Sequence, residues 1–229
     1  MVVIGSSFQR RQEKLCVANK TIENMDDETI KFYDAETDKC EELWLRPEKL
    51  KLANDWEQRF VATLPPHGRV CDYGCGSGRS ALFFAQSGLV CDAFDASESM
   101  VQMTRAKCST FPVTVEHKEF SEFQPDQGTY DGVWASSSLL HAKRSNLPAL
   151  LQSIHRSLKP GGTFYLGLKL GHGEHRDKLG RLYTYYKVDD LQEFVQAAGF
   201  RWHTHTTGRA IGVDNTEHEW IKIIAFCEK

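Results

Sequence analysis

One segment, residues 69–97, constrains the fold of this chain more than any other. It reads RVCDYGCGSGRSALFFAQSGLVCDAFDAS. A short apolar strand leads to Asp72, and a loop with glycines at alternate positions follows. After an apolar helix and a second short strand comes another acid, Asp95. Strand, glycine-rich loop, helix and strand in this order predict a βαβ unit.

The glycines and acids of this unit indicate a cofactor that carries a nucleoside. Gly74, Gly76 and Gly78 follow a GxGxG spacing, which by itself is also compatible with a tight turn that holds no ligand. Asp95 lies where an acid accepts hydrogen bonds from ribose hydroxyls. Pyrophosphate requires bare N–H groups without a nearby anion, yet Asp72 faces the loop. The pattern therefore favours a cofactor with positive charge, such as S-adenosylmethionine, over a nicotinamide dinucleotide.

Length and composition predict one main domain. With 229 residues, 41% of them hydrophobic, the chain can bury one sizeable core. We expect an N-terminal arm and helical cap over residues 1–64, with residues 1–28 as a loose arm, and a cofactor-binding domain over residues 65–229. A formal net charge of −3 disfavours nucleic acid as a partner. No apolar run approaches the roughly 18 residues that span a bilayer, and the seven cysteines are scattered. These features predict a cytoplasmic protein with reduced thiols and no membrane contact.

Helical and strand patterns alternate along the rest of the chain. Apolar spacing predicts helices within residues 29–64, the last beginning near Pro47. Alternating helices and strands imply a mostly parallel sheet covered on both faces. Further helices are expected at 97–108 and 147–158, and another, capped by Asp189 or Asp190, ends at Gly199; strands are expected at 113–117, 130–135, 163–170, 201–207 and 220–227.

Four segments together resemble the class I S-adenosylmethionine-dependent methyltransferases. They read VCDYGCGSGR, DAFDASESM, YDGVWASSSLLH and LKPGGTFYL, and the resemblance extends from residue 64 to the C-terminus. It is greatest for small stand-alone bacterial enzymes, including tellurite-resistance-like ones, which share SLLH and a later K-x-G-x-G-E…G-R stretch. The resemblance implies an α/β, Rossmann-like, seven-stranded sheet with an antiparallel last strand and helices on both faces. It also implies methyl transfer from S-adenosyl-L-methionine, which we expect to reach a small-molecule acceptor.

The same resemblance assigns cofactor contacts. Asp72, Gly74 and Gly76 would hold the methionine part and Gly78 would shape the loop; Asp95 would bind the ribose, Ala96, Met100 and Phe120 would lie beside the adenine, and Ala135 and Ser136 would border the methionyl end. Tyr33 is our candidate for an aromatic residue that caps the cofactor. The acid usual near Phe120 is not evident, since Glu119 and Glu122 flank that position. Either a backbone N–H or a glutamate could therefore contact the adenine.

Several charged residues follow strands whose carboxyl ends would face the methyl group. His141 follows the fourth predicted strand and is either a catalytic or substrate-contacting residue or a histidine bonded to backbone at a helix start. Lys169, Glu174 and Arg181 follow the fifth strand and form either an acceptor site or solvated loop charges. The nearby tyrosines at 183, 185 and 186 are interpreted as packing residues. The motif HGEH at 172–175 lacks a third ligand, so no metal is predicted.

Three other functions compete with this interpretation. The segment GRLYTYY is similar to part of the RNA methyltransferases that act on modified wobble uridines, although the acidic composition disfavours that reading. A partner protein that binds S-adenosylmethionine without catalysis would keep the same loop and Asp95. A nicotinamide-dependent dehydrogenase comes last. The sequence leaves open the acceptor, the methylated atom, the need for a general base and the oligomeric state.

Overall fold

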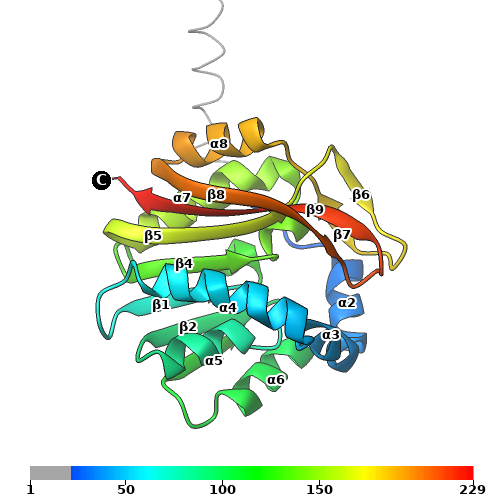
Figure 1. Ribbon diagram of the computed structural model, residues 1–229, viewed down its shortest axis with the longest axis horizontal. Coiled ribbons are helices and arrows are strands. Elements are labelled where there is room, and N and C mark those ends of the chain that lie inside the picture. The colour runs from blue at the N-terminus through cyan, green and yellow to red at the C-terminus, as the bar shows by residue number, and fades with distance from the viewer. Residues whose placement is uncertain (1–21, 229) are drawn as a thin grey trace, which may run out of the picture.

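The computed structural model describes residues 22–228, apart from the side chains of Glu48, Lys51 and Leu52. In this part, seven strands form one sheet in the order β3-β2-β1-β4-β5-β9-β8 (Figure 1). Within that sheet, only β9 runs antiparallel to its neighbours, β5 and β8. The predicted seven-stranded α/β sheet with an antiparallel last strand is therefore confirmed. The strands are β1 (Arg69–Tyr73), β2 (Val90–Asp95), β3 (Val113–His117), β4 (Tyr130–Ser136), β5 (Leu158–Lys169), β8 (Phe200–Ile211) and β9 (Glu217–Cys227).

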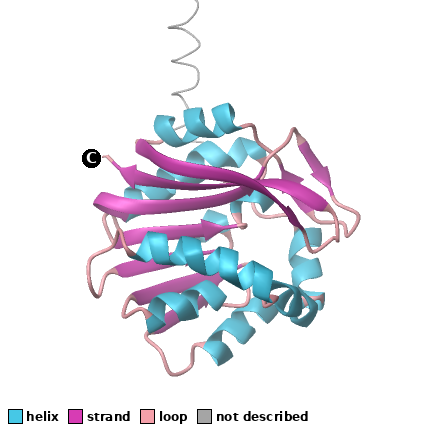
Figure 2. Ribbon diagram, in the orientation of Figure 1, coloured by secondary structure: helices cyan, strands magenta, loops and turns pink. Residues whose placement is uncertain are grey.

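Helices cover both faces of the sheet (Figure 2). Pro47 occupies the first turn of α4, where its missing N–H costs no hydrogen bond. Ser97 caps α6 by accepting from the Met100 N–H at 3.2 Å, as predicted. The α-helices are α2 (Asp27–Ala35), α3 (Thr37–Trp44), α4 (Pro47–Val61), α5 (Arg79–Gln86), α6 (Glu98–Lys107), α7 (Leu147–Ser157) and α8 (Val188–Ala197), and the short 3₁₀ turns are η1 (Phe120–Glu122), η2 (Leu139–His141) and η3 (Arg144–Asn146).

The core consists of two apolar clusters, one on each face of the sheet. Successive strand residues point to opposite faces, so Val133 and Ala135 enter one cluster while Trp134 enters the other. The first cluster receives side chains from α7 and α8, and the second receives Trp56 and Phe60 from α4. Helix α4 is thus part of the layered core, and its packing fixes the sheet beneath the loop that follows β1.

Two predictions about local structure are corrected, and one further element is found. Neither Asp189 nor Asp190 caps α8: Lys187 is the N-cap residue, and both aspartates lie in the first turn, where a helix dipole favours negative charge. Strands β8 and β9 are longer than predicted, because they continue as a hairpin beyond the sheet. A small antiparallel pair, β6 (Glu174–Arg176) and β7 (Leu182–Thr184), was not predicted. Of the arm predicted for residues 1–28, residues 1–21 lie outside the described part of the chain.

Distant segments meet at the carboxyl ends of β1 and β4, on the right of Figure 1. Helices α2 and α3 lie there, and the tip of the β8–β9 hairpin reaches the same side. Lys49 of α4 donates from Nζ to the Ile211 carbonyl at 3.0 Å, which joins the helices to the hairpin. Arg176 of β6 binds Asp26, the N-cap of α2, at 2.7 Å. No helix among residues 22–228 is long and apolar enough to cross a membrane.

Candidate active site

The loop after β1 brings backbone close to other elements in a way that requires glycine. Gly74 has φ +76° and Gly78 has φ +78°, which L side chains rarely adopt. A Cβ on Gly74 would lie 2.4 Å from the Ser138 Cβ, and one on Gly78 would lie 2.5 Å from the Thr104 side chain. Between them, the Gly76 N–H donates to Asp95 Oδ2 at 2.8 Å. The loop is therefore tied to the end of β2 before any ligand arrives.

Asp72, near the end of β1, presents an unsatisfied carboxylate oxygen to a cavity. The residue is 3% exposed and its Oδ2 has no hydrogen-bond partner among the described residues. Arg79 forms no hydrogen bond with this oxygen; its guanidinium instead makes a two-pronged ion pair with Glu57 at 2.8 and 2.9 Å. Burial, and then the Glu57 charge, raise the pKa of Asp72 to about 8. A buried acceptor without a donor is costly, so this atom is suited to a cationic ligand group.

Asp95 ends β2 at the opposite side of the glycine loop. Its Oδ1 accepts from the Ser97 N–H at 3.0 Å, in addition to the Gly76 contact at Oδ2. Burial raises the pKa of Asp95, although these N–H groups oppose that effect. Ala96, Met100 and Phe120 continue the apolar wall beside it. The carboxylate oxygens of Asp95 thus lie next to apolar side chains against which a flat ligand group could pack.

The two glutamates near Phe120 have structural roles. Glu119 and Glu122 form a capping box around η1, in which the Glu119 N–H donates to Glu122 Oε2 at 2.8 Å. Glu119 Oε2 also accepts from the Met25 N–H at 2.6 Å. Neither glutamate lines the cavity. Of the two adenine contacts left open by the sequence, the structure leaves the backbone N–H available.

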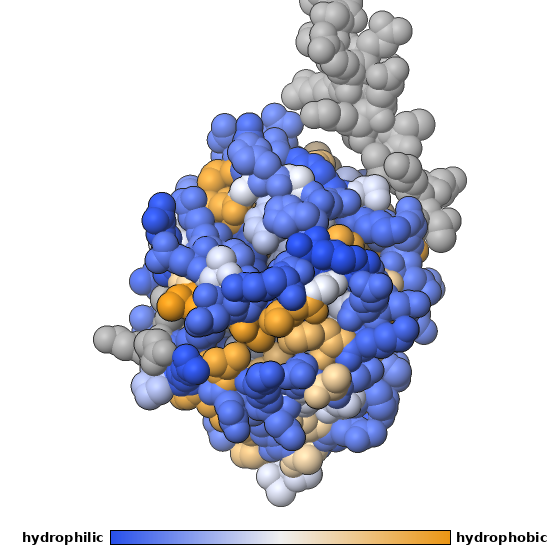
Figure 3. Space-filling model, turned by 90° about the vertical axis from the view of Figure 1, so that its right-hand side faces the viewer, coloured by the Kyte–Doolittle hydropathy of each residue, from blue (hydrophilic) through white to orange (hydrophobic). Residues whose placement is uncertain are grey.

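The cavity itself has a volume of about 370 Å³ and lies at the carboxyl edge of the sheet. Figure 3, which views this side, has apolar side chains gathered at its centre within a hydrophilic surround. Trp44 of α3, Trp134 of β4 and Tyr165 of β5 contribute aromatic walls. Residues 206–213 of the β8–β9 hairpin form a further wall. Elements from both ends of the described chain thus line the cavity.

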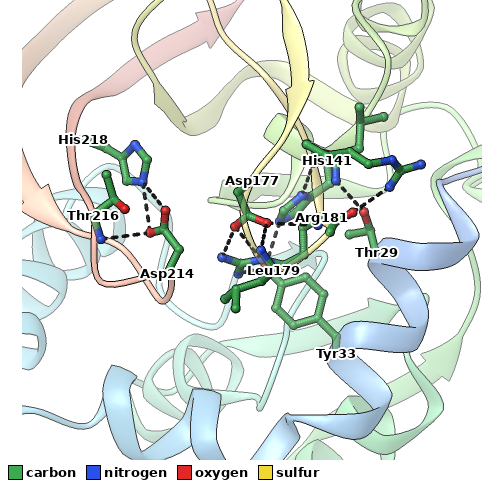
Figure 4. A network of polar contacts seen from close by, with 12 residues as sticks. Thr29, Tyr33, His141, Asp177, Leu179, Arg181, Asp214, Thr216 and His218 are labelled. Atoms are coloured by element: carbon green, nitrogen blue, oxygen red, sulfur yellow. Dashed lines mark hydrogen bonds and ion pairs between the residues drawn. The ribbon is translucent and has the colours of Figure 1, made fainter.

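A chain of hydrogen bonds links Tyr33, His141 and Arg181, which all line the cavity (Figure 4). His141 Nδ1 lies 2.7 Å from the Leu182 carbonyl, which can only accept, so Nδ1 carries the proton. His141 Nε2 is then the acceptor for the Tyr33 hydroxyl at 2.9 Å. The Tyr33 oxygen in turn accepts from Arg181 Nη1 at 3.1 Å. Asp177 completes the chain by binding Arg181 Nη2 at 2.6 Å.

This network holds His141 neutral. Burial, followed by the positive charges of Arg181 and Lys169, lowers the pKa of His141 to about 3, against the opposing effect of the Leu182 carbonyl. The pKa of Tyr33 is raised to about 12, mainly by burial. At neutral pH the pair is therefore a phenol that donates to an imidazole. A histidine of such low basicity orients its neighbour rather than removing a proton itself.

Lys169, the last residue of β5, lines the cavity near His141, since both side chains contact the Tyr183 ring. It is 1% exposed, and its Nζ has no hydrogen-bond partner among the described residues. The ammonium nitrogen lies 3.6 Å from the centroid of the Tyr183 ring and 5.4 Å from that of Trp220. Burial lowers the pKa of Lys169 to about 8.

Most of the predicted site residues are brought together. Those that line the cavity are Tyr33, Asp72, Gly74, Gly76, Asp95, Ala96, Met100, Phe120, Ser136, His141, Lys169 and Arg181. Three others do not. Gly78 is the N-cap of α5 and faces Thr104; Ala135 points to the opposite face of β4 from Ser136. Glu174 is exposed on β6, where it accepts from the Arg144 N–H.

The sequence reasoning missed several wall residues. Trp134 precedes Ser136 by two positions on β4, so the period of a strand could have placed both on one face. Tyr183, interpreted as packing, lines the cavity. Trp44 and Trp220 reach the cavity only through tertiary contacts, so no local sequence pattern predicts their position there. Among the described residues, no group of three or more His, Cys, Asp or Glu side chains is placed to hold a metal ion.

The residues fit an adenosyl cofactor with an amino-acid tail. The unpartnered Asp72 oxygen suits its ammonium group, Asp95 suits ribose hydroxyls, and Ala96, Met100 and Phe120 suit an adenine. Residues 46–208 match the family described as "Methyltransferase domain". The chain belongs to this family, the class I S-adenosylmethionine-dependent methyltransferases.

Relatives of known sequence or structure agree with that assignment. A 2-heptyl-1-hydroxyquinolin-4(1H)-one methyltransferase of Mycobacteroides abscessus is 32% identical over 123 residues, which cover 52% of this chain and 50% of that protein. The chain spans about half the length of the curated relatives it matches. The crystal structure of Burkholderia thailandensis 1,6-didemethyltoxoflavin-N1-methyltransferase, with that compound and S-adenosylhomocysteine bound, has a TM-score of 0.70 at 19% identity and covers 89% of this chain and 88% of that one. A TehB-like methyltransferase of Corynebacterium glutamicum has a TM-score of 0.62 at 17% identity, with 85% and 99% covered.

Proposed function

We propose that this protein transfers a methyl group from S-adenosylmethionine to a small molecule. The observation that carries the proposal is one cavity whose lining residues form two chemically distinct groups, here called its two halves. One half contains Asp72 and Asp95; the other contains Tyr33, His141 and Lys169. Residues 206–213 of the hairpin and residues of α3 and α4 line it together, and a cavity of about 370 Å³ suits a small acceptor better than a polymer. The small molecules named for the Mycobacteroides abscessus and Burkholderia thailandensis relatives support this choice.

The cofactor half has the groups needed to bind and orient its ligand. Asp72 Oδ2 would accept from the ammonium of the methionine part, and Asp95 would accept from the ribose. Ala96, Met100 and Phe120 would pack against the adenine. When bound, S-adenosylmethionine supplies a methyl group made electrophilic by its sulfonium. The chain would contribute by aligning the acceptor with that methyl group.

The second half would position the acceptor. Tyr33 is fixed by donating to His141 Nε2 and accepting from Arg181, so its oxygen has a defined place in the cavity wall. We assign His141 as a positioning residue for Tyr33, because both of its ring nitrogens are occupied and its pKa is low. An acceptor that arrives ionised needs no base, and the electron pair of its nucleophilic atom would form the new bond to carbon.

Calorimetric titration with S-adenosylmethionine tests the cofactor site. Asp95→Ala is expected to weaken binding by about 1–3 kcal/mol, roughly 5- to 150-fold, since hydrogen bonds to a charged acceptor are lost. Asp92→Ala is the matched control: Asp92 is also on β2, but it binds Arg69 at 2.8 Å outside the cavity. Unchanged affinity in Asp95→Ala, or an equal loss in Asp92→Ala, would contradict the ribose assignment.

The size class of the acceptor can be tested separately. A cell extract is incubated with the protein and with S-adenosylmethionine labelled in its methyl group, then divided by ultrafiltration. We expect the label in the low-molecular-weight filtrate, and less of it there with Asp95→Ala. Label retained with RNA or protein would overturn the small-molecule proposal, and cofactor binding without any transfer would indicate a non-catalytic binding protein.

A further inference from the structure

Lys169 is the most unusual charged group in the second half of the cavity. It is the last residue of β5, where it pairs in register with Trp220 of β9. Its ammonium is almost fully buried and has no hydrogen-bond partner within residues 22–228. A buried ammonium that forms no hydrogen bond with a counter-charge is unfavourable for folding. Its presence at a cavity wall therefore suggests that a ligand supplies the missing partner.

None of the neighbouring carboxylates forms a hydrogen bond with Lys169, because each already accepts from other donors. Four groups act on it electrostatically: Asp214 and Asp177 favour its charged form, while Arg181 and Lys49 oppose it. Asp177 makes hydrogen bonds of 2.6 and 3.1 Å to Arg181. Asp214 binds His218 Nε2 at 3.1 Å and the Thr216 N–H at 3.3 Å. Each carboxylate is thus committed to another donor.

Aromatic rings surround this ammonium. The Tyr183 and Trp220 rings lie within cation–π range of Nζ and also line the cavity. The His141 ring packs on Tyr183 with centroids 4.6 Å apart. A cation between aromatic walls offers charge to an anion and flat apolar surface to the ring that bears it.

We propose that the acceptor half of the cavity binds a planar organic anion, such as an aromatic carboxylate or an ionised ring hydroxyl, with its negative charge on the Lys169 ammonium and its ring against Tyr183 and Trp220. This proposal rests on the proposed function for its identification of that half as the acceptor site. A nearby ammonium favours the ionised form of such an acceptor. In the transfer, the acceptor's electron pair forms the bond to the methyl carbon, the carbon–sulfur bond breaks, and its electrons remain on sulfur. No proton has to leave, and the sulfonium and the acceptor anion both lose their charge.

Three compounds of one shape test the charge preference. These are 2-naphthoate, 2-naphthamide and 2-naphthamidine, which differ mainly in carrying negative, zero and positive charge. Each is titrated calorimetrically into the full-length protein saturated with S-adenosylhomocysteine. We expect 2-naphthoate to bind about 10- to 100-fold more tightly than 2-naphthamide, the range for a hydrogen bond to a charged group. 2-Naphthamidine should bind most weakly. Equal affinity for the three compounds would overturn the proposal.

Variants assign the preference to one nitrogen atom. Lys169→Met keeps an unbranched apolar stem beside the rings and should abolish the preference for 2-naphthoate. Lys222→Met is the matched control, because Lys222 also lines the cavity but lies over Trp56 at 6.0 Å. If Lys222→Met lost the preference for 2-naphthoate to the same extent, the preference would come from the general positive potential of the cavity and not from Lys169. If Lys169→Met fails to fold, Lys169→Gln is tested in its place with the same expected result.

Two readouts separate this inference from the proposed function. Lys169→Met should bind S-adenosylhomocysteine with unchanged affinity, since Lys169 is not among the cofactor contacts. Absence of S-adenosylhomocysteine binding by the unmodified protein would defeat the proposed function itself. Normal binding of S-adenosylhomocysteine without any charge preference would defeat only the anion site. Once an acceptor is identified, Lys169→Met should raise its KM much more than it lowers kcat.

Discussion

Asp72 allows a quantitative test of how the empty site is charged. Its carboxyl group is buried, its Oδ2 lacks a partner, and its pKa is raised to about 8 by burial and by Glu57. At pH 7 such a group is about nine-tenths protonated in the empty protein. The ammonium of a bound cofactor would favour the ionised form and displace that proton. Binding at pH 7 should therefore release about 0.9 proton from Asp72, and at pH 8 about 0.5.

The released protons can be counted by calorimetry with S-adenosylhomocysteine, which carries the ammonium without the sulfonium. The observed enthalpy is measured in phosphate and in Tris, buffers with very different ionisation enthalpies, at pH 7 and pH 8. In Asp72→Asn the buffer dependence at pH 7 should disappear. Affinity should also fall by about 1–3 kcal/mol, because the charged hydrogen bond is lost.

The same raised pKa has a consequence for stability. Because the folded pKa of Asp72 exceeds its unfolded value of 3.8, the folded state retains a proton that the unfolded state has lost between about pH 4 and pH 8. Stability of the empty protein should fall with rising pH across that window, by at most about 1.4 kcal/mol per pH unit from this group. Asp72→Asn removes this loss, so the variant should unfold at a higher temperature than the unmodified protein at pH 8.

Three results would refute this reasoning. Tight binding at pH 7 without buffer dependence would mean that Asp72 is already ionised in the empty protein, balanced by Arg79. Proton release that persists in Asp72→Asn would assign the proton to Asp95, whose pKa burial also raises. A variant of Asp72 that binds S-adenosylhomocysteine normally would remove this residue from the cofactor site.

Two further predictions concern the acceptor half and the loop. Tyr33→Phe removes the hydroxyl between His141 and Arg181, and we expect slower methyl transfer in the extract assay with unchanged S-adenosylhomocysteine affinity; a comparable loss of affinity would place Tyr33 over the cofactor instead. Gly78→Ala should destabilise the protein by about 1–3 kcal/mol in urea unfolding, because φ is +78° and the new Cβ meets Thr104. Gly88→Ala, with φ +82° and open space around it, isolates the backbone strain; an equal loss there would contradict the steric argument.

The cofactor half could be predicted from sequence because its signals are local. The glycines of the loop, Asp72 and Asp95 all lie within one βαβ unit, where turn sterics and strand ends dictate residue types. Ser97 as a helix cap and Pro47 at a first turn follow from equally local chemistry. These features lie where the sequence predicts them because no distant segment is needed to place them.

The acceptor half could be predicted only in part, because its walls come from residues far apart in sequence. Tyr33 meets His141 across 108 positions, and the Trp220 ring reaches Lys169 because β9 returns antiparallel to β5. Proximity in the chain predicts that Glu174 lies beside Lys169. The β6–β7 hairpin instead pairs Glu174 with Thr184 and leaves the Glu174 side chain exposed. Strand pairing decides which of these charged residues line the cavity, and strand pairing cannot be read from proximity in the sequence.

Buried polar atoms without hydrogen-bond partners occur in both halves of the cavity. Folded proteins leave few buried polar atoms without partners, and those that remain need an explanation. Seven such side-chain atoms occur within residues 22–228, and four of them belong to residues that line the cavity: Asp72, Trp134, Ser138 and Lys169. Two of the four carry ionisable groups of opposite type. A ligand pair with a cationic amino-acid tail at Asp72 and an anionic acceptor at Lys169 would satisfy both. The cost of leaving these atoms unpaired in the empty protein is thus a physical reason for the cavity to bind two oppositely charged ligands together.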